Sequence, residues 1–431
     1  MRRLAAVLAL CVFSVAAFAQ TTAIVGGKVH TVGPQGTIEN ATILIVDGKI
    51  RSVGTGLRIP ANATTINADG KLITPGLFSP IGRLGLVEVG LSAGPVDSEQ
   101  RGEQFTAGFD VADAYNRRST LIPVNRIEGI TRAAIVPSPG SPDDSGSAGH
   151  VLSGLAAIVN LGDDDVLDRR GAAMVVTLGQ SGSAFAGGTR SGAWLTLRNA
   201  LEEAADYRDH KGDVERGMRR EYQHSIADLE ALQSVIAGDI PLLVRINRAA
   251  DIEVLIEITD AHGLKAIIYG GSEAWMVADK LAAARIPVIL APNSNLPGSF
   301  DSVNARRGAA NLLVDAGVRI ALADSQSQTH NARNITQSAG NAVADGLDWD
   351  AALRAITLAP AQIYGVADSV GSIEAGKSAD IVIWPADPFE LTTYPDQVLI
   401  NGVVIPMISR QTLLRDRYLQ TDSEKPPAYR D

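Results

Sequence analysis

The middle of the chain constrains the fold most strongly, because short apolar segments alternate there with helical ones. Long helical stretches are expected at 194–207 and 215–237. The apolar segments, each short enough for a buried strand, lie at 174–178, 242–246, 265–269, 287–290 and 319–323. Strands that are joined through helices pair in parallel, since each crossover returns the chain to the same edge. The pattern therefore predicts an α/β fold with a parallel sheet, either open or closed into a barrel.

Both ends of the chain are rich in β-branched residues and turn signals instead. Asp47-Gly48 and Asp69-Gly70 separate the first group of short runs, and Asn401-Gly402 predicts a hairpin in the second. The expected strands lie at 22–25, 29–32, 41–46, 50–53, 64–67, 379–384, 397–400 and 403–407. We therefore expect a β-rich unit that is split across the two ends and surrounds the β/α body.

The first 19 residues have the pattern of a secretory signal. Arg2 and Arg3 precede an apolar run over 4–18, and Ala17-Phe18-Ala19 has the small residues of a cleavage site. The run is shorter than the roughly 20 apolar residues of a membrane span. We expect an exported, periplasmic or secreted protein that is cleaved after Ala19. Cys11 is the single cysteine, so the mature chain would contain no disulfide, thiolate metal site or cysteine nucleophile.

Composition excludes several other classes of protein. With 38 basic and 48 acidic residues, the formal net charge is −10, which argues against a nucleic-acid partner. The 431 residues are 45% hydrophobic, which suits one large domain and a small one. We find no membrane span in the mature chain, and neither a phosphate-binding loop motif nor a Gly-x-Ser-x-Gly nucleophile motif occurs in it.

Three motifs resemble the amidohydrolase superfamily, its imidazolonepropionase-like branch especially. The segment Asp-Gly-Lys-Leu-Ile-Thr-Pro-Gly-Leu at 69–77 resembles the entry of that family's chain into its barrel. Residues 371–384 resemble the exit from the barrel, and 352–361 its last helix. The resemblance covers roughly 22–410 and implies a (β/α)8 TIM-like barrel with a small β-sandwich. The domain limits that follow are 1–19 for the signal peptide, 76–365 for the barrel, 20–75 with 366–412 for the sandwich, and 413–431 for a C-terminal tail.

The resemblance also implies a metal site, and this sequence departs from it. The family uses Zn²⁺ or another divalent metal to activate water for the hydrolysis of non-peptide C–N bonds. The first strand should end in Ile-Asp-x-His-x-His. The ligand positions are instead occupied by residues that bind no metal or bind it poorly, namely Ile81, Arg83, Gln180, Arg245 and Gly270. Only the Asp of the eighth strand is retained, as Asp324. We therefore predict no cofactor.

Other residues do not rebuild the site by their spacing. None of the six histidines has a second one at ligand spacing, although His150 and His330 lie in loops from which the barrel mouth is within reach. Arg83 and Arg245 would bring positive charge to the place of the metal. One hypothesis is that one or both pair with Asp324, and the alternative is that they extend outward to solvent.

Three functions remain open, and the sequence identifies no substrate. The favoured one is an exported amidohydrolase-family protein with a degenerate metal site, which has lost or altered catalysis and acts in binding, in a homo-oligomer or in an assembly with an active relative. The second is an active hydrolase with a rearranged site, in which Asp324 is the general base and Arg83 or Arg245 stabilises the oxyanion. The third is a binding protein that captures an anionic ligand through Arg83 and Arg245.

Overall fold

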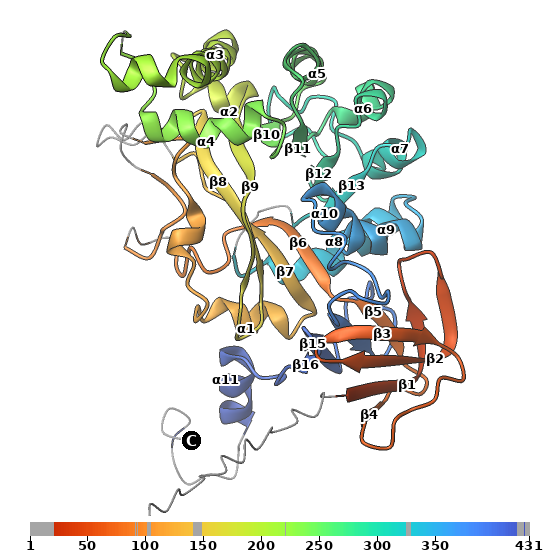
Figure 1. Ribbon diagram of the computed structural model, residues 1–431. Helices are drawn as coiled ribbons and strands as arrows, with labels where there is room; N and C mark the ends of the chain where they lie inside the picture. The colour runs from red at the N-terminus through yellow and green to blue at the C-terminus, as the bar shows by residue number, and fades with distance from the viewer. Residues whose placement is uncertain are drawn as a thin grey trace, which may run out of the picture.

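A computed structural model describes residues 21–90, 92, 94–100, 105–140, 149–219, 221–324, 329–419 and 426. The expected signal peptide at 1–19, with Cys11 and the cleavage site, lies outside the described residues. The strands form two sheets of eight, one in a small β-domain and one in a barrel (Figure 1). The fold class expected from the sequence is confirmed.

The small β-domain joins the two ends of the chain. Its sheet has the order β16-β15-β14-β5-β1-β2-β3, and β4 pairs with β1. The junction is the antiparallel pairing of β14 with β5. The strands are β1 (Thr21–His30), β2 (Thr37–Val46), β3 (Lys49–Gly54), β4 (Thr64–Asn67), β5 (Leu72–Pro75), β14 (Ile381–Trp384), β15 (Gln397–Ile400) and β16 (Val403–Val404).

The second sheet forms a nearly closed barrel with the order β13-β12-β11-β10-β9-β8-β7-β6. Its strands are β6 (Leu77–Gly82), β7 (Ile130–Ile135), β8 (Leu152–Asn160), β9 (Leu167–Thr177), β10 (Leu242–Ile246), β11 (Ala266–Gly270), β12 (Val288–Leu290) and β13 (Ile320–Leu322). All pair in parallel except β8, which is antiparallel to both of its neighbours.

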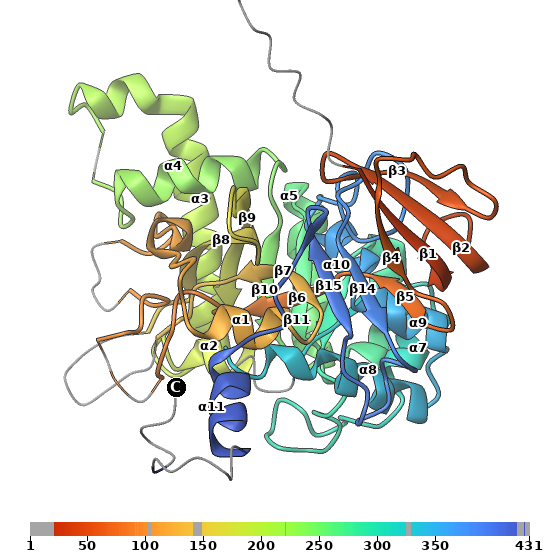
Figure 2. The same cartoon turned by 90° about the horizontal axis from the view of Figure 1, so that it is seen from below.

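Helices cover the outside of the barrel (Figure 1). Seen from below, α3 and α4 extend on the side away from the strands β1 to β3 (Figure 2). Among the described helices, none combines the length and hydrophobicity that a membrane span requires. The helices are α1 (Leu121–Arg126), α2 (Gly179–Ser183), α3 (Arg190–Glu215), α4 (Ile226–Ile236), α5 (Ala249–His262), α6 (Ala278–Ala284), α7 (Ala309–Asp315), α8 (Ile335–Ala344), α9 (Trp349–Ala355), α10 (Leu358–Ile363) and α11 (Arg410–Leu419), with 3-10 turns η1 (Val111–Ala114), η2 (Ala274–Val277) and η3 (Ala332–Asn334).

Four parts of the fold differ from the expectation. The helix expected at 215–237 is interrupted, because α3 ends at Glu215 and the Ser225 side chain caps a new helix, α4, by accepting from the Asp228 backbone N–H. The β8–β9 hairpin, which lies in the barrel wall, was not expected. The last barrel helix, expected at 352–361, is two short helices, α9 and α10. In the expected tail, residues up to Leu419 belong to α11.

A largely buried ion pair joins α3 to the residue just before the cap of α4. His224 Nδ1 lies 2.9 Å from Glu203 Oε2, and both side chains are about one-tenth exposed. The Glu203 carboxylate accepts backbone hydrogen bonds from Gln223 and His224 as well. Burial raises the pKa of Glu203, but these hydrogen bonds and the imidazole outweigh it, so the pKa lies below its ordinary value.

We expect the Glu203→Gln substitution to destabilise the fold by about 1–2 kcal/mol at neutral pH, since it removes charge-assisted hydrogen bonds between α3 and α4. A depressed carboxylate pKa gives stability that is present above the unfolded pKa of about 4.5 and is lost as the pH falls through the lower, folded value. Denaturant titrations at neutral and acidic pH measure this. If the difference in unfolding free energy between the original protein and Glu203→Gln stays the same well below pH 4, this account is wrong.

Candidate functional site

A cavity of about 210 Å³ lies at the carboxyl ends of the barrel strands, where TIM-barrel active sites are found. Residues from β6, β7, β9, β10 and β11 or just beyond them enclose it. They are Ile81, Gly82, Arg83, Val136, Pro137, Ser138, Pro139, Val175, Thr177, Leu243, Arg245 and Tyr269. Three of the positions singled out in the sequence, Ile81, Arg83 and Arg245, therefore meet in one cavity, which we call the arginine cavity.

Strand register explains why Arg245 and Tyr269 are neighbours. Arg245 is paired with Thr177 of β9 on one side and with Tyr269 of β11 on the other. Paired residues project to the same face of a sheet, and Leu243, two residues before Arg245, packs inside the barrel. The three side chains therefore form one layer at the top of the barrel. The sequence analysis missed Tyr269 and Thr177, although both lie at the end of a strand with the same inward alternation as Arg245.

The polar groups of the arginine cavity are cationic or neutral. Its lining contains two guanidinium groups and the hydroxyls of Ser138, Thr177 and Tyr269, but no carboxylate among the described residues. Within the described part of the chain, neither Arg83 nor Arg245 forms a salt bridge, so the expected pairing with Asp324 is not observed. Asp324 does not line the arginine cavity or the second cavity described below, and it interacts with another group of the protein.

A buried tyrosine lies in the barrel interior near the cavity. Tyr364 is fully buried in the interior cluster, and its hydroxyl donates to the Pro80 carbonyl at 2.7 Å. Burial, together with the nearby Tyr269, raises the pKa of Tyr364 far above its ordinary value. The phenol of Tyr364 therefore stays protonated and uncharged.

The residues in the barrel mouth do not fit the family's metal. Ile81 is apolar and 6% exposed, and Arg83 and Arg245 carry positive charge. Gly270 lacks a side chain, has a φ of +99°, and a Cβ there would lie 2.6 Å from Asn247 Oδ1. Across the described residues, no group of three or more His, Cys, Asp or Glu side chains is placed to hold an ion. His150 and His330 line neither the arginine cavity nor the second cavity described below.

The last substituted position, Gln180, belongs to a different feature of the mouth. It is exposed in the first turn of α2, and its backbone N–H donates to Asp301 Oδ2 at 2.7 Å. Asp301 is also paired with Arg190, which lies 3.3 Å from Asp251. These contacts hold the loop at 291–308 beside the mouth. Gln180 contributes its backbone N–H to them, and it does not line the arginine cavity or the cavity described next.

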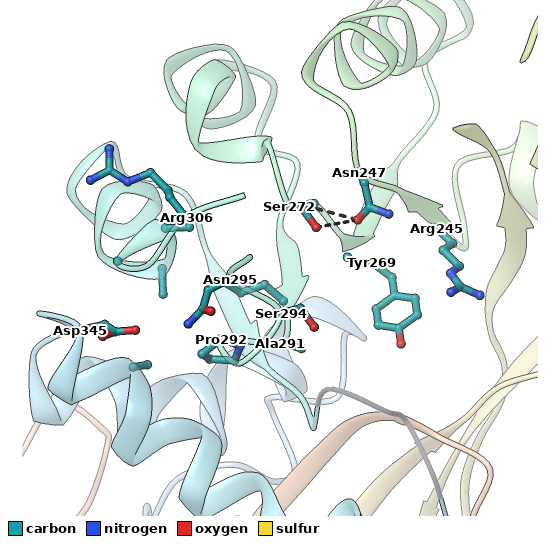
Figure 3. Close-up of a pocket in the computed structure, with 17 residues that line it drawn as sticks. Arg245, Asn247, Tyr269, Ser272, Ala291, Pro292, Ser294, Asn295, Arg306 and Asp345 are labelled. Carbon is teal, nitrogen blue, oxygen red and sulfur yellow. Dashed lines mark hydrogen bonds between the residues drawn. The ribbon is translucent and has the colours of Figure 1, made fainter. Parts of the chain in front are cut away.

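A second cavity of about 180 Å³ adjoins the first and shares Arg245 and Tyr269 with it (Figure 3). Its other walls come from the ends of β10, β11 and β12, the loop at 291–308, and the helices α7 and α8. We call it the amide cavity after its two asparagines, Asn247 and Asn295. Gly270 lines it too, so four of the six positions from the sequence analysis lie around the two cavities.

Comparison with known proteins agrees with this fold. The model of the amidohydrolase family matches residues 200–405 of the chain. The amidohydrolase tasK of Hapsidospora irregularis is 24% identical over 392 residues. The alignment covers 85% of this chain and 39% of that relative, so the chain spans about two fifths of the length of the curated relative that it matches.

Solved structures extend the likeness to the whole barrel. An amidohydrolase from Thermotoga maritima MSB8 has a TM-score of 0.78 at 24% identity, and the match covers 89% of this chain and 99% of that chain. Molinate hydrolase has a TM-score of 0.56 at 19% identity and covers 90% and 95%. The family model and the shared fold both support the resemblance to the amidohydrolase superfamily. This likeness describes the scaffold, and the function has to be argued from the site.

Proposed function

We propose that this protein binds a small anionic ligand in its barrel mouth, at the place where its relatives would hold a metal, and that it carries out no metal-dependent hydrolysis. One observation carries the proposal. Arg83 and Arg245 line the same cavity, and no carboxylate among the described residues lines it with them. Two unneutralised guanidinium groups repel a divalent cation and attract an anion.

A carboxylate is the anion that this geometry suits best. The planar guanidinium fork donates two parallel hydrogen bonds to a carboxylate, and hydrogen bonds to charged groups contribute about 1.5–3 kcal/mol each. The neighbouring Tyr269 hydroxyl is a further polar group for the ligand. The cavity volume of about 210 Å³ admits a small molecule, and its apolar walls, such as Ile81 and Val175, suit an alkyl chain.

Titration with butyrate tests this proposal, with binding followed by ligand-observed NMR and calorimetry. We expect the purified chain to bind butyrate with a Kd near or below about 1 mM. The Arg83→Ala and Arg245→Ala variants are each expected to bind at least about tenfold more weakly. Arg198→Ala is the matched control, since Arg198 is exposed on α3 and lines neither cavity.

Metal analysis of the same purified protein distinguishes the anion site from a rearranged hydrolase site. After dialysis against Zn²⁺, elemental analysis is expected to find less than one equivalent of bound metal. Stoichiometric Zn²⁺ that is lost in Asp324→Asn would favour the rearranged hydrolase site instead. Butyrate binding that is equal in all the arginine variants would refute the anion site.

We also propose export, on the basis of Arg2, Arg3, the apolar run at 4–18 and the Ala17-Phe18-Ala19 sequence. Expression of the full chain in a bacterial host tests it. The mass of the protein from the periplasmic or secreted fraction should correspond to a chain that begins at Gln20. An uncleaved chain that is retained in the cytoplasm would contradict the proposal.

A further inference from the structure

The arginine and amide cavities have a common wall, and this bears on the shape of the ligand. Arg245 and Tyr269 line both cavities, because they are register partners at the ends of β10 and β11. In Figure 3 both side chains point into the same region of the mouth. A ligand held by Arg245 in the first cavity is therefore adjacent to the second.

The amide cavity offers a fixed hydrogen-bond donor. Asn247 Oδ1 accepts from the Ser272 hydroxyl at 3.1 Å and from the Ser272 backbone N–H at 3.4 Å. These two hydrogen bonds occupy the Asn247 amide oxygen, so its amide nitrogen can donate to a ligand. Figure 3 shows this nitrogen on the side of Asn247 that faces Arg245. The orientation suits an uncharged group with a carbonyl oxygen.

Besides Arg245, the charged side chains that line the amide cavity are already engaged with other groups. The Asp345 carboxylate lines the cavity and is held by Arg307 at 2.5 Å, with its side chain 8% exposed. The cation nearest to it in the lining, Arg306, lies over the Trp275 ring at 5.0 Å and is directed away from Asn295 (Figure 3). A second carboxylate in this cavity would therefore have to share Arg245 with the first one.

Building on the proposed function, we infer that the ligand has two arms that meet beside Arg245 and Tyr269. One arm is a carboxylate that is bound between Arg83 and Arg245. The other is an uncharged amide whose carbonyl accepts from Asn247 in the amide cavity, where the Asn295 side chain offers both a donor and an acceptor. The ligand class is thus the half-amides of dicarboxylic acids.

Three probes that share a three-carbon chain attached to a carboxylate test the inference. They are butyrate, glutaramate, which is butyrate with a carboxamide at the end of its chain, and glutarate, which carries a second carboxylate there. One or two added hydrogen bonds should make glutaramate bind about five- to twentyfold more tightly than butyrate. Glutarate should bind more weakly than glutaramate, because its second carboxylate must share Arg245 with the first and cannot donate a hydrogen bond to the Asn295 amide oxygen.

Two variants test whether the tighter binding of glutaramate depends on the amide cavity. Asn247→Ala is expected to remove the advantage of glutaramate and to leave butyrate binding within about twofold. Asn293→Ala is the matched control, because Asn293 lies in the loop at 291–308 beside the cavity but bonds to Asn341 and does not line the cavity. Thermal melts of both variants check that they fold.

The outcomes separate the inference from the function on which it rests. Equal binding of butyrate and glutaramate, or tighter binding of glutarate, would overturn the two-armed ligand and leave the anion site intact. An advantage of glutaramate that survives in Asn247→Ala would overturn it as well. If none of the three probes binds, both the inference and the proposed function fail.

Discussion

Replacing Arg132 by Ala is expected to destabilise the protein by about 3–5 kcal/mol, because it leaves the buried Asp380 carboxylate and the partly exposed Asp168 carboxylate without their counter-charge. Arg132 belongs to β7 of the barrel and its side chain is 3% exposed. Its guanidinium lies 2.6 Å from Asp168 and 3.0 Å from Asp380, and it donates to Asn401 Oδ1 at 2.7 Å. Asp380 and Asn401 belong to the small β-domain, so the group joins the two sheets.

Denaturant unfolding at two pH values measures the effect. Burial raises the pKa of Asp168 and of Asp380, and Arg132 counteracts this. Without Arg132 both folded-state pKa values should rise further above the unfolded ones. A carboxyl group with a raised pKa destabilises the fold while it is ionised, and this penalty is relieved as the pH falls through the raised value. The deficit of the variant should therefore be smaller near about pH 5 than near about pH 8.

Arg170 provides a matched control, since it also bridges two aspartates. It lies 2.7 Å from Asp110 and 2.8 Å from Asp113, but its side chain is 49% exposed. We expect Arg170→Ala to change the free energy of unfolding by less than about 1 kcal/mol, because water and salt screen exposed pairs. Equal effects of the two substitutions would show that burial of Arg132 does not determine its contribution.

The parts of the fold that follow from local patterns were predictable from the sequence. The motif at 69–77 contains β5 and leads directly into β6, as its resemblance implied. Strand β10 has the bounds expected from its apolar run. The β8–β9 hairpin was not predictable in this way, because an antiparallel pair replaces the crossover helix that strand–helix alternation leads one to expect.

The candidate site was predictable only in part, for a geometric reason. Arg83 and Arg245 were aligned with strand ends by motif, and the carboxyl ends of parallel strands converge in any such barrel. Tyr269 and Asn247 depend on which residues pair across β10 and β11 and on how the chain turns after the strands. That information lies in register and backbone angles. A single sequence without its partner strands does not contain it.

Substituting Gly270 is expected to have the second large effect, and it tests whether the metal site can be restored. A side chain at a φ of +99° costs roughly 1–2 kcal/mol in backbone strain, and a Cβ would displace Asn247 from its bonds to Ser272. We expect Gly270→Ala to destabilise the fold by about 2–3 kcal/mol in denaturant titrations. Gly317→Ala isolates the backbone part, since Gly317 has a φ of +85° and nothing lies within 4 Å of a Cβ there.

The same strain should prevent recovery of the family's metal chemistry by simple reversion. In a variant that carries Ile81→His, Arg83→His and Gly270→His, the first two imidazoles can reach the mouth, but the third is attached to a backbone that disfavours any side chain. We expect elemental analysis after dialysis against Zn²⁺ to find less than one equivalent. Stoichiometric, tightly held Zn²⁺ in this variant would mean that the turn after β11 adapts easily and that only side chains separate this mouth from a metal site. If no Zn²⁺ is bound, the backbone as well as the side chains separates this mouth from a metal site. Asn247 and Ser272 would then hold the turn after β11 in a form suited to a different ligand.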